Sequence, residues 1–247
     1  MEEKNAIDFL LYSYFGVTTE SEWKMCVKAA IVKAYNDATM EGAYNTLIPK
    51  KNIDLRKKSD SAKKEAAKLI KTHIKELFTS YSGEFDKWHS TLCEEIKNKY
   101  SNVNSENTLF TYGNAQKWVN MTIKYICILD LLNHNHDYHD NIEKYMKHFH
   151  VPVDSYIIEA TWKDTQIKIP VKNKNKDRGK YNSEKVKTWS KWEKTDYTDF
   201  QDSLKIILGN KKPLEWEAET WVKQSEIRKK NEKQAKRDTF FKENNPL

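Results

Sequence analysis

The stretch Tyr112-Gly-Asn-Ala-Gln-Lys117 begins a helical pattern of apolar residues that runs to Leu132. A glycine at the start of a helix favours the left-handed backbone of a tight turn between two helices. The helix that follows would present free backbone N–H groups and the positive end of its dipole, and together these bind phosphate. Because Lys117 lies about one turn into the helix, its amine is predicted close to whatever the turn holds.

A second segment, Val151-Pro-Val-Asp154, precedes another apolar helical pattern that reaches Trp162. The proline stops the preceding element, and Asp154 stands where the N-cap of the next helix is expected. Its carboxylate is therefore predicted at the mouth of a helix. The two segments thus place a lysine and an aspartate at the starts of two separate helices.

The rest of the chain is also helical in pattern. Six glycines and five prolines in 247 residues are too few for most turn-rich β architectures, and apolar residues recur at spacings of three and four. We expect an all-α fold, with the only candidate strand at 166–171 and a polar break from Pro49 to Asp60. The expected helices are 21–43, 61–80, 84–100, 109–132, 154–162, 194–208 and 213–236, with a short helix or irregular turn at 141–150.

The charge balance favours a polyanionic partner. Forty-three basic residues against 36 acidic ones give a net charge of +7, and nucleic acid is the first candidate for such a chain. Lysine far outnumbers arginine, which is typical of an AT-rich coding sequence, so the total charge alone decides little. Two basic segments, 172–180 and 228–237, are either phosphate contacts or solvated low-complexity chain.

Cysteine and histidine usage predicts neither a metal nor a cofactor. The three cysteines are far apart and form no CxxC pair, which argues against a zinc ribbon or an iron–sulfur cluster. Five histidines lie between His134 and His150, where a His-x-His-x-x-His run is either a zinc site or, as we favour, a polar surface loop. The odd cysteine count suits a reducing cytoplasm, and no stretch is apolar and long enough to cross a bilayer.

The two segments together resemble the helix-hairpin-helix DNA glycosylase superfamily, with most similarity to the branch of the 8-oxoguanine and archaeal GO glycosylases. There, a Gly-x-Gly-x-Lys hairpin precedes one helix and a Val-Pro-Val-Asp segment opens another. The resemblance covers roughly residues 109–162. It implies that Lys117 is the amine nucleophile that attacks the sugar C1′, and that Asp154 stabilises the developing positive charge and helps to activate Lys117. The phosphate contacts that it implies are the backbone amides of Gly113, Asn114, Ala115 and Gln116.

This sequence departs from the superfamily pattern at three points. Ala115 replaces the second hairpin glycine, so the turn must accommodate a Cβ. The distance from Lys117 to Asp154 is longer than in the common type, because 133–140 looks inserted, and a longer distance is similar to the archaeal branch. No four-cysteine cluster follows, which excludes the iron–sulfur branch.

A base pocket is expected near the C-terminus, because a glycosylase must take its target base out of the duplex stack. Glu217 and Trp221 lie one turn apart on one predicted helix and resemble the carboxylate and tryptophan that hold the base in the archaeal enzymes. Trp189 is a further aromatic candidate. The alternative is that these tryptophans belong to the core.

We therefore expect one glycosylase-like unit over 1–247, built from two helical subdomains that flank a cleft. The first would span 60–165 and contain the hairpin at 109–125 and the Asp154 segment. The second would be formed by 1–59 and 166–247, with the helices of the two chain ends packed together.

The function we expect is excision of a modified base from double-stranded DNA, which leaves an abasic site, with a lyase step through Lys117 left open. The base would be 8-oxoguanine or a hypermodified base of a phage genome, and the role repair or antiviral defence. A monomer without cofactor or metal, acting in the cytoplasm and away from membranes, is expected. The alternatives are a non-catalytic helix-hairpin-helix DNA-binding protein and a helical interaction protein without a DNA role.

Overall fold

The computed structural model describes residues 2–39, 48, 52–104, 109–133, 138–172 and 181–244, with side chains described as far as residue 239. The regular elements in these ranges are helices, and the one bridge outside them is an isolated antiparallel pair between Val171 and Val186. The prediction of an all-α fold is thus confirmed for these ranges. The candidate strand at 166–171 is reduced to this single bridge.

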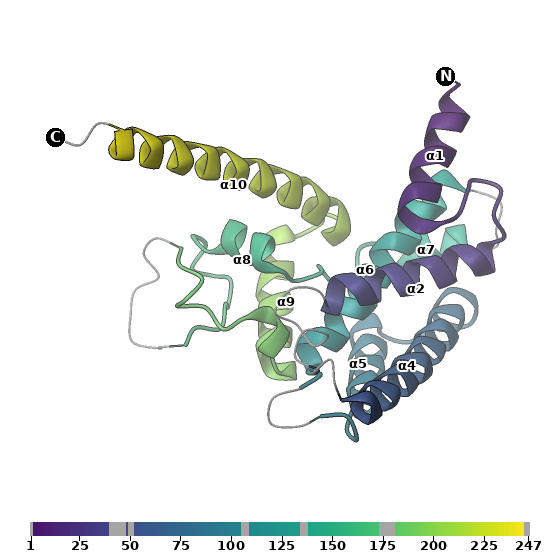
Figure 1. Ribbon diagram of the computed structural model, residues 1–247. Helices are drawn as coiled ribbons and strands as arrows, with labels where there is room; N and C mark the ends of the chain where they lie inside the picture. Colours follow the sequence, from purple (N-terminus) through teal and green to yellow (C-terminus); the bar gives the residue numbers. More distant parts are fainter. Residues whose placement is uncertain are drawn as a thin grey trace.

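Figure 1 shows the helices in their order along the chain. They are α1 (Glu3–Phe15), α2 (Trp23–Thr39), α4 (Ile53–Thr79), α5 (Phe85–Lys99), α6 (Tyr112–Leu132), α7 (His139–Tyr145), α8 (Ser155–Thr161), the 3₁₀ turn η1 (Trp189–Lys191), α9 (Lys194–Leu208) and α10 (Pro213–Asn244).

Two helices differ from the sequence prediction. The expected break before Asp60 is wrong from Ile53 onward, because Asn52 caps α4 by accepting the backbone N–H of Leu55 at 3.0 Å. The lysines that made this stretch look irregular lie on the solvent side of a regular helix. Helix α1 was not predicted, and of its thirteen residues only Leu11 is buried, so its sequence carries almost no apolar period.

Helix α6 is the centre of the fold, and nearly all of its side chains are buried. A helix that is buried on all sides needs partners on all sides. Helix α2 packs along one side of α6 and α5 along another, while η1 and α9 contact its first turns. Polar bonds fix α2 in place: the Trp118 indole donates to the Ile31 carbonyl at 2.9 Å, and the Asn114 amide donates to the Ala38 carbonyl at 3.0 Å.

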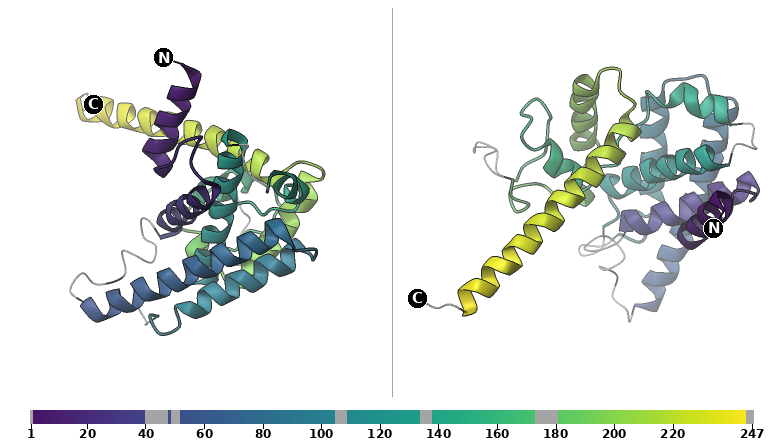
Figure 2. Two further views of the ribbon diagram at one scale, coloured as in Figure 1. Left: turned by 90° about the vertical axis from the view of Figure 1, so that its right-hand side faces the viewer. Right: turned by 90° about the horizontal axis from the view of Figure 1, so that it is seen from above.

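The predicted second subdomain is wrong for the described helices. Helices α1 and α2 lie on one side of α6, whereas α9 and α10 lie on the other (Figures 1 and 2). Helix α10 packs on α8 instead of on the N-terminal helices. The buried apolar side chains form a single cluster that includes residues from Leu11 to Leu214, so both ends of the chain are attached to the same core.

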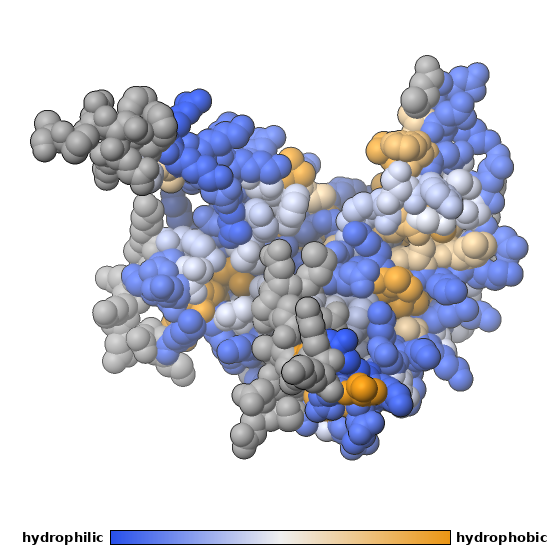
Figure 3. Space-filling model, viewed as in Figure 1, coloured by the Kyte–Doolittle hydropathy of each residue, from blue (hydrophilic) through white to orange (hydrophobic). Residues whose placement is uncertain are grey.

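The second half of α10 projects beyond the body of the molecule, and α1 projects from the opposite side (Figures 1 and 2). The surface between these two helices is recessed, and the projecting part of α10 is hydrophilic (Figure 3). Within the described ranges, no helix combines the length and the apolar character that a membrane crossing requires.

Candidate active site

The predicted hairpin turn at Gly113 is wrong, because this glycine lies inside the first turn of α6. Thr111 is the N-cap, and with Asn114 it forms a reciprocal capping box. Among the described glycines, only Gly16 and Gly209 have a positive φ. Glycine is required at 113 for a different reason: a Cβ there would stand 2.1 Å from the backbone oxygen of Trp189.

The predicted phosphate contacts of the α6 N-terminus are also contradicted. The Gly113 N–H donates to the Trp192 carbonyl at 2.9 Å, and the N–H groups of Asn114 and Ala115 donate to the Thr111 side chain and carbonyl at 3.2 and 3.1 Å. Asn114 and Gln116 are buried, with 1% and 0% of their surface exposed. The amides are therefore occupied by the segment around η1 and by the cap, and none is free to bind DNA.

We expect Gly113→Ala to destabilise the protein and to displace Trp189. Alanine in a helix is about 1 kcal/mol more favourable than glycine. Overpacking typically costs about 1–3 kcal/mol, and a clash with backbone lies at the upper end of that range. Urea unfolding should therefore show a net loss of stability. An increase in stability would mean that η1 does not press on α6 as described.

Lys117 and Asp154 form a buried ion pair between α6 and the start of α8. The Lys117 Nζ lies 3.2 Å from Asp154 Oδ2, and only 4% of the lysine surface is exposed. The prediction that Asp154 is an N-cap is confirmed, because its Oδ1 accepts the backbone N–H groups of Tyr156 and Ile157 at 2.9 and 3.0 Å. Asp154 Oδ2 accepts a further bond from the Trp221 indole N–H at 3.1 Å.

The surroundings keep Asp154 ionised. Burial alone would raise the pKa of this carboxyl, but the positive charge of Lys117 and the two helix N–H groups outweigh burial and lower the pKa below its ordinary value. The site therefore holds a fixed negative charge beside an amine. Such an arrangement can stabilise a positive charge that develops on a bound substrate.

The three predicted pocket residues lie around this pair. The Trp189 ring centroid is 5.9 Å from the Lys117 Nζ, and Trp221 contacts Asp154 through its indole nitrogen. Glu217 is 1% exposed, and burial raises its pKa against the charges of Lys124 and Lys117. The structure thus brings five residues from α6, α8, η1 and α10 together: Lys117, Asp154, Trp189, Glu217 and Trp221.

Lys124 also lies at this site, and the two sequence segments do not include it. The Lys124 Nζ lies 2.5 Å from Glu217 Oε2, and the lysine side chain is 18% exposed. Lys124 follows Lys117 by seven residues, a spacing that places both on the same face of a helix. This spacing is a usable signal, although Lys124 stands within the most apolar stretch of the chain.

Helix α10 covers the site and is fixed there by Arg228. The Arg228 guanidinium contacts Glu159 at 2.5 Å and donates to the Ser155 side chain and carbonyl at 3.1 and 2.8 Å. It also lies 4.0 Å from the ring of Tyr156, which itself packs on Trp221. Lys117 is 4% exposed, so a substrate as large as a nucleotide would reach the amine only after one of the surrounding elements, α8, η1 or α10, moves.

A second polar network is centred on Asn120 of α6. The His89 Nε2 is 2.8 Å from the Asn120 side-chain oxygen, and the Asn120 amide donates to the Tyr197 hydroxyl at 2.8 Å. His150 connects this hydroxyl to Asp86, at 2.8 Å on both sides. The hydrogen bond with His150 lowers the pKa of Asp86 to about 2. The network joins α5, α6 and α9 to the segment that leads to Asp154.

We expect acid to destabilise the protein through His89. Burial, and next the charge of His150, hold the pKa of His89 well below its ordinary value. In the unfolded chain the His89 imidazole binds a proton near pH 6.5, whereas in the folded chain it stays neutral at that pH. The free energy of unfolding therefore decreases as the pH falls below about 6.5, by at most about 1.4 kcal/mol per pH unit. Asp86 stabilises the folded chain in a separate pH range. This stabilisation is lost as the pH falls from the ordinary pKa of an aspartate to about 2.

Urea unfolding between pH 6.5 and 5 measures this effect. His89→Gln should flatten the pH dependence. His139→Asn is the control, because Asp130 raises the pKa of His139 and so gives the opposite sign. An unchanged slope in His89→Gln would exclude His89 as the titrating group.

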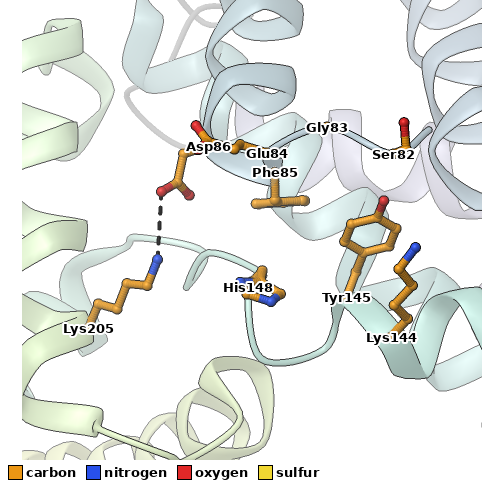
Figure 4. Close-up of a pocket in the computed structure, with 9 residues that line it drawn as sticks. All are labelled: Ser82, Gly83, Glu84, Phe85, Asp86, Lys144, Tyr145, His148 and Lys205. Carbon is orange, nitrogen blue, oxygen red and sulfur yellow. Dashed lines mark ion pairs between the residues drawn. The ribbon is translucent and has the colours of Figure 1, made fainter.

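Three surface cavities of the described chain are lined by residues other than the predicted site residues. One of about 480 Å³ lies between the start of α5, the end of α7 and Lys205 of α9, where Lys205 pairs with Asp86 at 3.6 Å (Figure 4). Within the described ranges, no three His, Cys, Asp or Glu side chains gather as metal ligands would. His134 and His136 lie outside those ranges, as does most of the basic segment 172–180.

Comparisons of the chain with protein-family models, with curated proteins and with solved structures gave no match. The resemblance to the helix-hairpin-helix glycosylases therefore rests on the residues of the two segments and on their arrangement around Lys117.

Proposed function

We propose that the protein is a DNA N-glycosylase that excises a modified base. The observation that carries the proposal is the buried Lys117–Asp154 pair with two tryptophans at its border and a buried carboxylate beside it. A buried lysine–aspartate pair adds little net stability, because the cost of removing both charges from water offsets their attraction. Stability alone therefore does not account for this pair. An amine, a carboxylate and aromatic faces are the groups that base excision requires.

In this reaction Lys117 is the nucleophile. The Lys117 ammonium of the ion pair first gives one proton to solvent, which frees its lone pair. The neutral amine then attacks the sugar C1′, the bond from C1′ to the base breaks, and the electron pair goes to the base nitrogen. The amine loses a proton as the new bond forms, and a proton passes to the departing base. Asp154 remains ionised and stabilises the positive charge on the sugar. The first product is an aminal in which C1′ is bonded to the lysine nitrogen and to O4′. The sugar ring then opens: the C1′–O4′ bond breaks, O4′ takes up the proton that the nitrogen loses, and a Schiff base forms. Water hydrolyses this Schiff base to an abasic site unless a lyase step cleaves the strand.

Glu217 and Lys124 supply polar groups for recognition of the base. A carboxylate accepts hydrogen bonds from neighbouring N–H groups, and an ammonium donates to a carbonyl oxygen. The Watson–Crick edge of a guanine presents two such donor groups and one such oxygen. An 8-oxoguanine would therefore satisfy the pair, and a hypermodified phage base with the same edge is the other candidate substrate.

A non-catalytic helix-hairpin-helix module has less support, because the amides that would grip phosphate at Gly113 are already bonded. A helical interaction protein without a DNA role has one observation in its favour. Helix α1 exposes apolar side chains, among them Phe9 at 67% and Leu10 at 65%.

The test is a panel of duplexes, each with one modified base. Released base is measured by mass spectrometry, and abasic sites are measured by alkaline cleavage. We expect release from at least one guanine-type lesion and none from unmodified DNA. Failure to release any base, together with failure to form a borohydride-stable adduct on abasic duplex, would overturn the proposal.

We expect Trp221→Ala to weaken binding of the modified duplex but not of the unmodified one. The substitution removes a face on which the extruded base stacks, worth about 1–3 kcal/mol. Val222→Ala is the control, because Val222 is 54% exposed on the same helix. Fluorescence anisotropy with both duplexes measures the effect. Equal weakening of the two duplexes would place Trp221 in a general contact instead of a base pocket.

A further inference from the structure

The distal part of α10, residues 229–239, is a helical segment without a buried side, and we name it the arm. All of its side chains are exposed, and Ala235 is its only apolar residue. Helices in globular proteins are normally held by an apolar face that packs on the body. The arm has no such face and extends into solvent (Figures 1 and 2).

The charges of the arm are one-sided. Its five basic residues outnumber its two acidic ones, Glu232 and Asp238. At 3.6 residues per turn the basic side chains fall within roughly a third of the helix circumference, and both acidic residues fall outside that third. In the described part of the chain, the last basic residue of α10 in an ion pair is Arg228. The basic stripe consists of Lys229, Lys230, Lys233, Lys236 and Arg237.

The arm continues the helix that covers the candidate active site. Glu217, Trp221 and Arg228 lie on the part of α10 that contacts α6 and α8. The stripe turns away from the side of the helix on which Arg228 meets Glu159. Because the helix is uninterrupted, a displacement of the arm also displaces the part of α10 that contacts α6 and α8.

We propose that the arm binds backbone phosphates of the duplex beside the target base, and that this contact draws α10 away from Lys117. This inference rests on the proposed glycosylase function, in which Lys117 is the amine that reacts. Eleven helical residues extend roughly 16 Å, about the axial length of four to five phosphates on one DNA strand. A membrane surface is the less suitable partner, because an interfacial helix needs an apolar face to insert and the arm has none.

Salt dependence of binding tests the contact. The arm variant is Lys229→Gln/Lys233→Gln/Lys236→Gln, and the matched control is Lys64→Gln/Lys68→Gln/Lys71→Gln, three exposed lysines of α4. Affinity for an unmodified duplex is measured across salt concentrations with the full chain. Three lost phosphate contacts should make the log–log slope shallower by up to about 2.7 in the arm variant and leave it unchanged in the control.

The proposed phosphate contact would be wrong if the salt slope of duplex affinity were unchanged in the arm variant, or if it changed equally in the control. Loss of binding to anionic phospholipid vesicles, with duplex binding intact, would assign the arm to membranes and also overturn it.

Movement of α10 is measured by the NMR resonance of the Trp221 indole N–H, which donates to Asp154 in this structure. The protein is labelled with ¹⁵N at its tryptophan indoles, and Trp221→Phe assigns the resonance. Saturating duplex should shift this resonance in the wild type and leave it in place in the arm variant. The same shift in both proteins would overturn the coupling.

Failure of the arm proposal and failure of the proposed glycosylase function give different results in these experiments. A wild type that passes both tests but forms no adduct on abasic DNA would retain the arm as a duplex contact and lose the glycosylase chemistry. A wild type that forms the adduct but shows no effect of the arm variant would lose only the arm.

Discussion

Lys117→Gln is expected to abolish covalent trapping of the protein on abasic duplex by borohydride and to reduce base release by about 10³-fold or more. Glutamine has no amine to form the Schiff base that borohydride reduces. The fold should persist, because Asp154 keeps its bonds from Tyr156, Ile157 and Trp221 when the lysine is gone. Trapping is measured by gel shift after reduction, beside a thermal unfolding curve.

The matched control for this variant is Lys124→Gln, which removes the neighbouring amine of the same helix face and leaves Lys117 in place. We expect this variant to be trapped on abasic duplex, where no base needs to be recognised. Trapping of the Lys117→Gln protein at the wild-type level would remove Lys117 from the mechanism.

Asp154→Asn should destabilise the protein as well as slow the reaction. Asparagine caps a helix about as well as aspartate, so the loss of the cap contributes little. The substitution leaves a lysine that is 4% exposed without a counter-charge, and an uncompensated buried charge typically costs about 3–5 kcal/mol. Base release should fall by about 10²–10³-fold, as it does when a group that stabilises transition-state charge is removed.

A double-mutant cycle separates the two effects. Lys117→Met/Asp154→Asn should be more stable in urea than Asp154→Asn alone, because no buried charge is left without a partner. Losses of stability that simply add would contradict the ion pair. A variant that loses about 1 kcal/mol of stability and retains normal turnover would reduce Asp154 to a cap.

The sequence predicted the helical class and the cap at Asp154 because both are carried by local signals. Asp154 after a proline and before an apolar run is a cap in almost any context, and the structure confirms it. Only the resemblance predicted that Glu217 and Trp221 lie near Lys117. In the structure Trp221 donates to Asp154 and the charge of Lys117 acts on Glu217, while their role as a base pocket stays a prediction.

The predictions that were wrong concern features set by contacts between segments that lie far apart in the sequence. Gly113 was read as a turn because a glycine near a helix start usually marks one, whereas here a carbonyl that lies far along the chain, at Trp189, excludes a Cβ. The packing of α2 on one side of α6 and α9 on the other could not be predicted, because α6 is buried on nearly all sides and its sequence shows no single face for one partner. Lys124 could have been found from its seven-residue spacing to Lys117.

The central claim is that one amine, that of Lys117, reacts with the sugar. The most direct measurement is to reduce the complex with abasic duplex, digest the protein and the DNA, and locate the modified lysine by mass spectrometry. We expect the sugar remnant on Lys117. A remnant on Lys124 or on the N-terminal amine, or its absence from every peptide, would contradict the account.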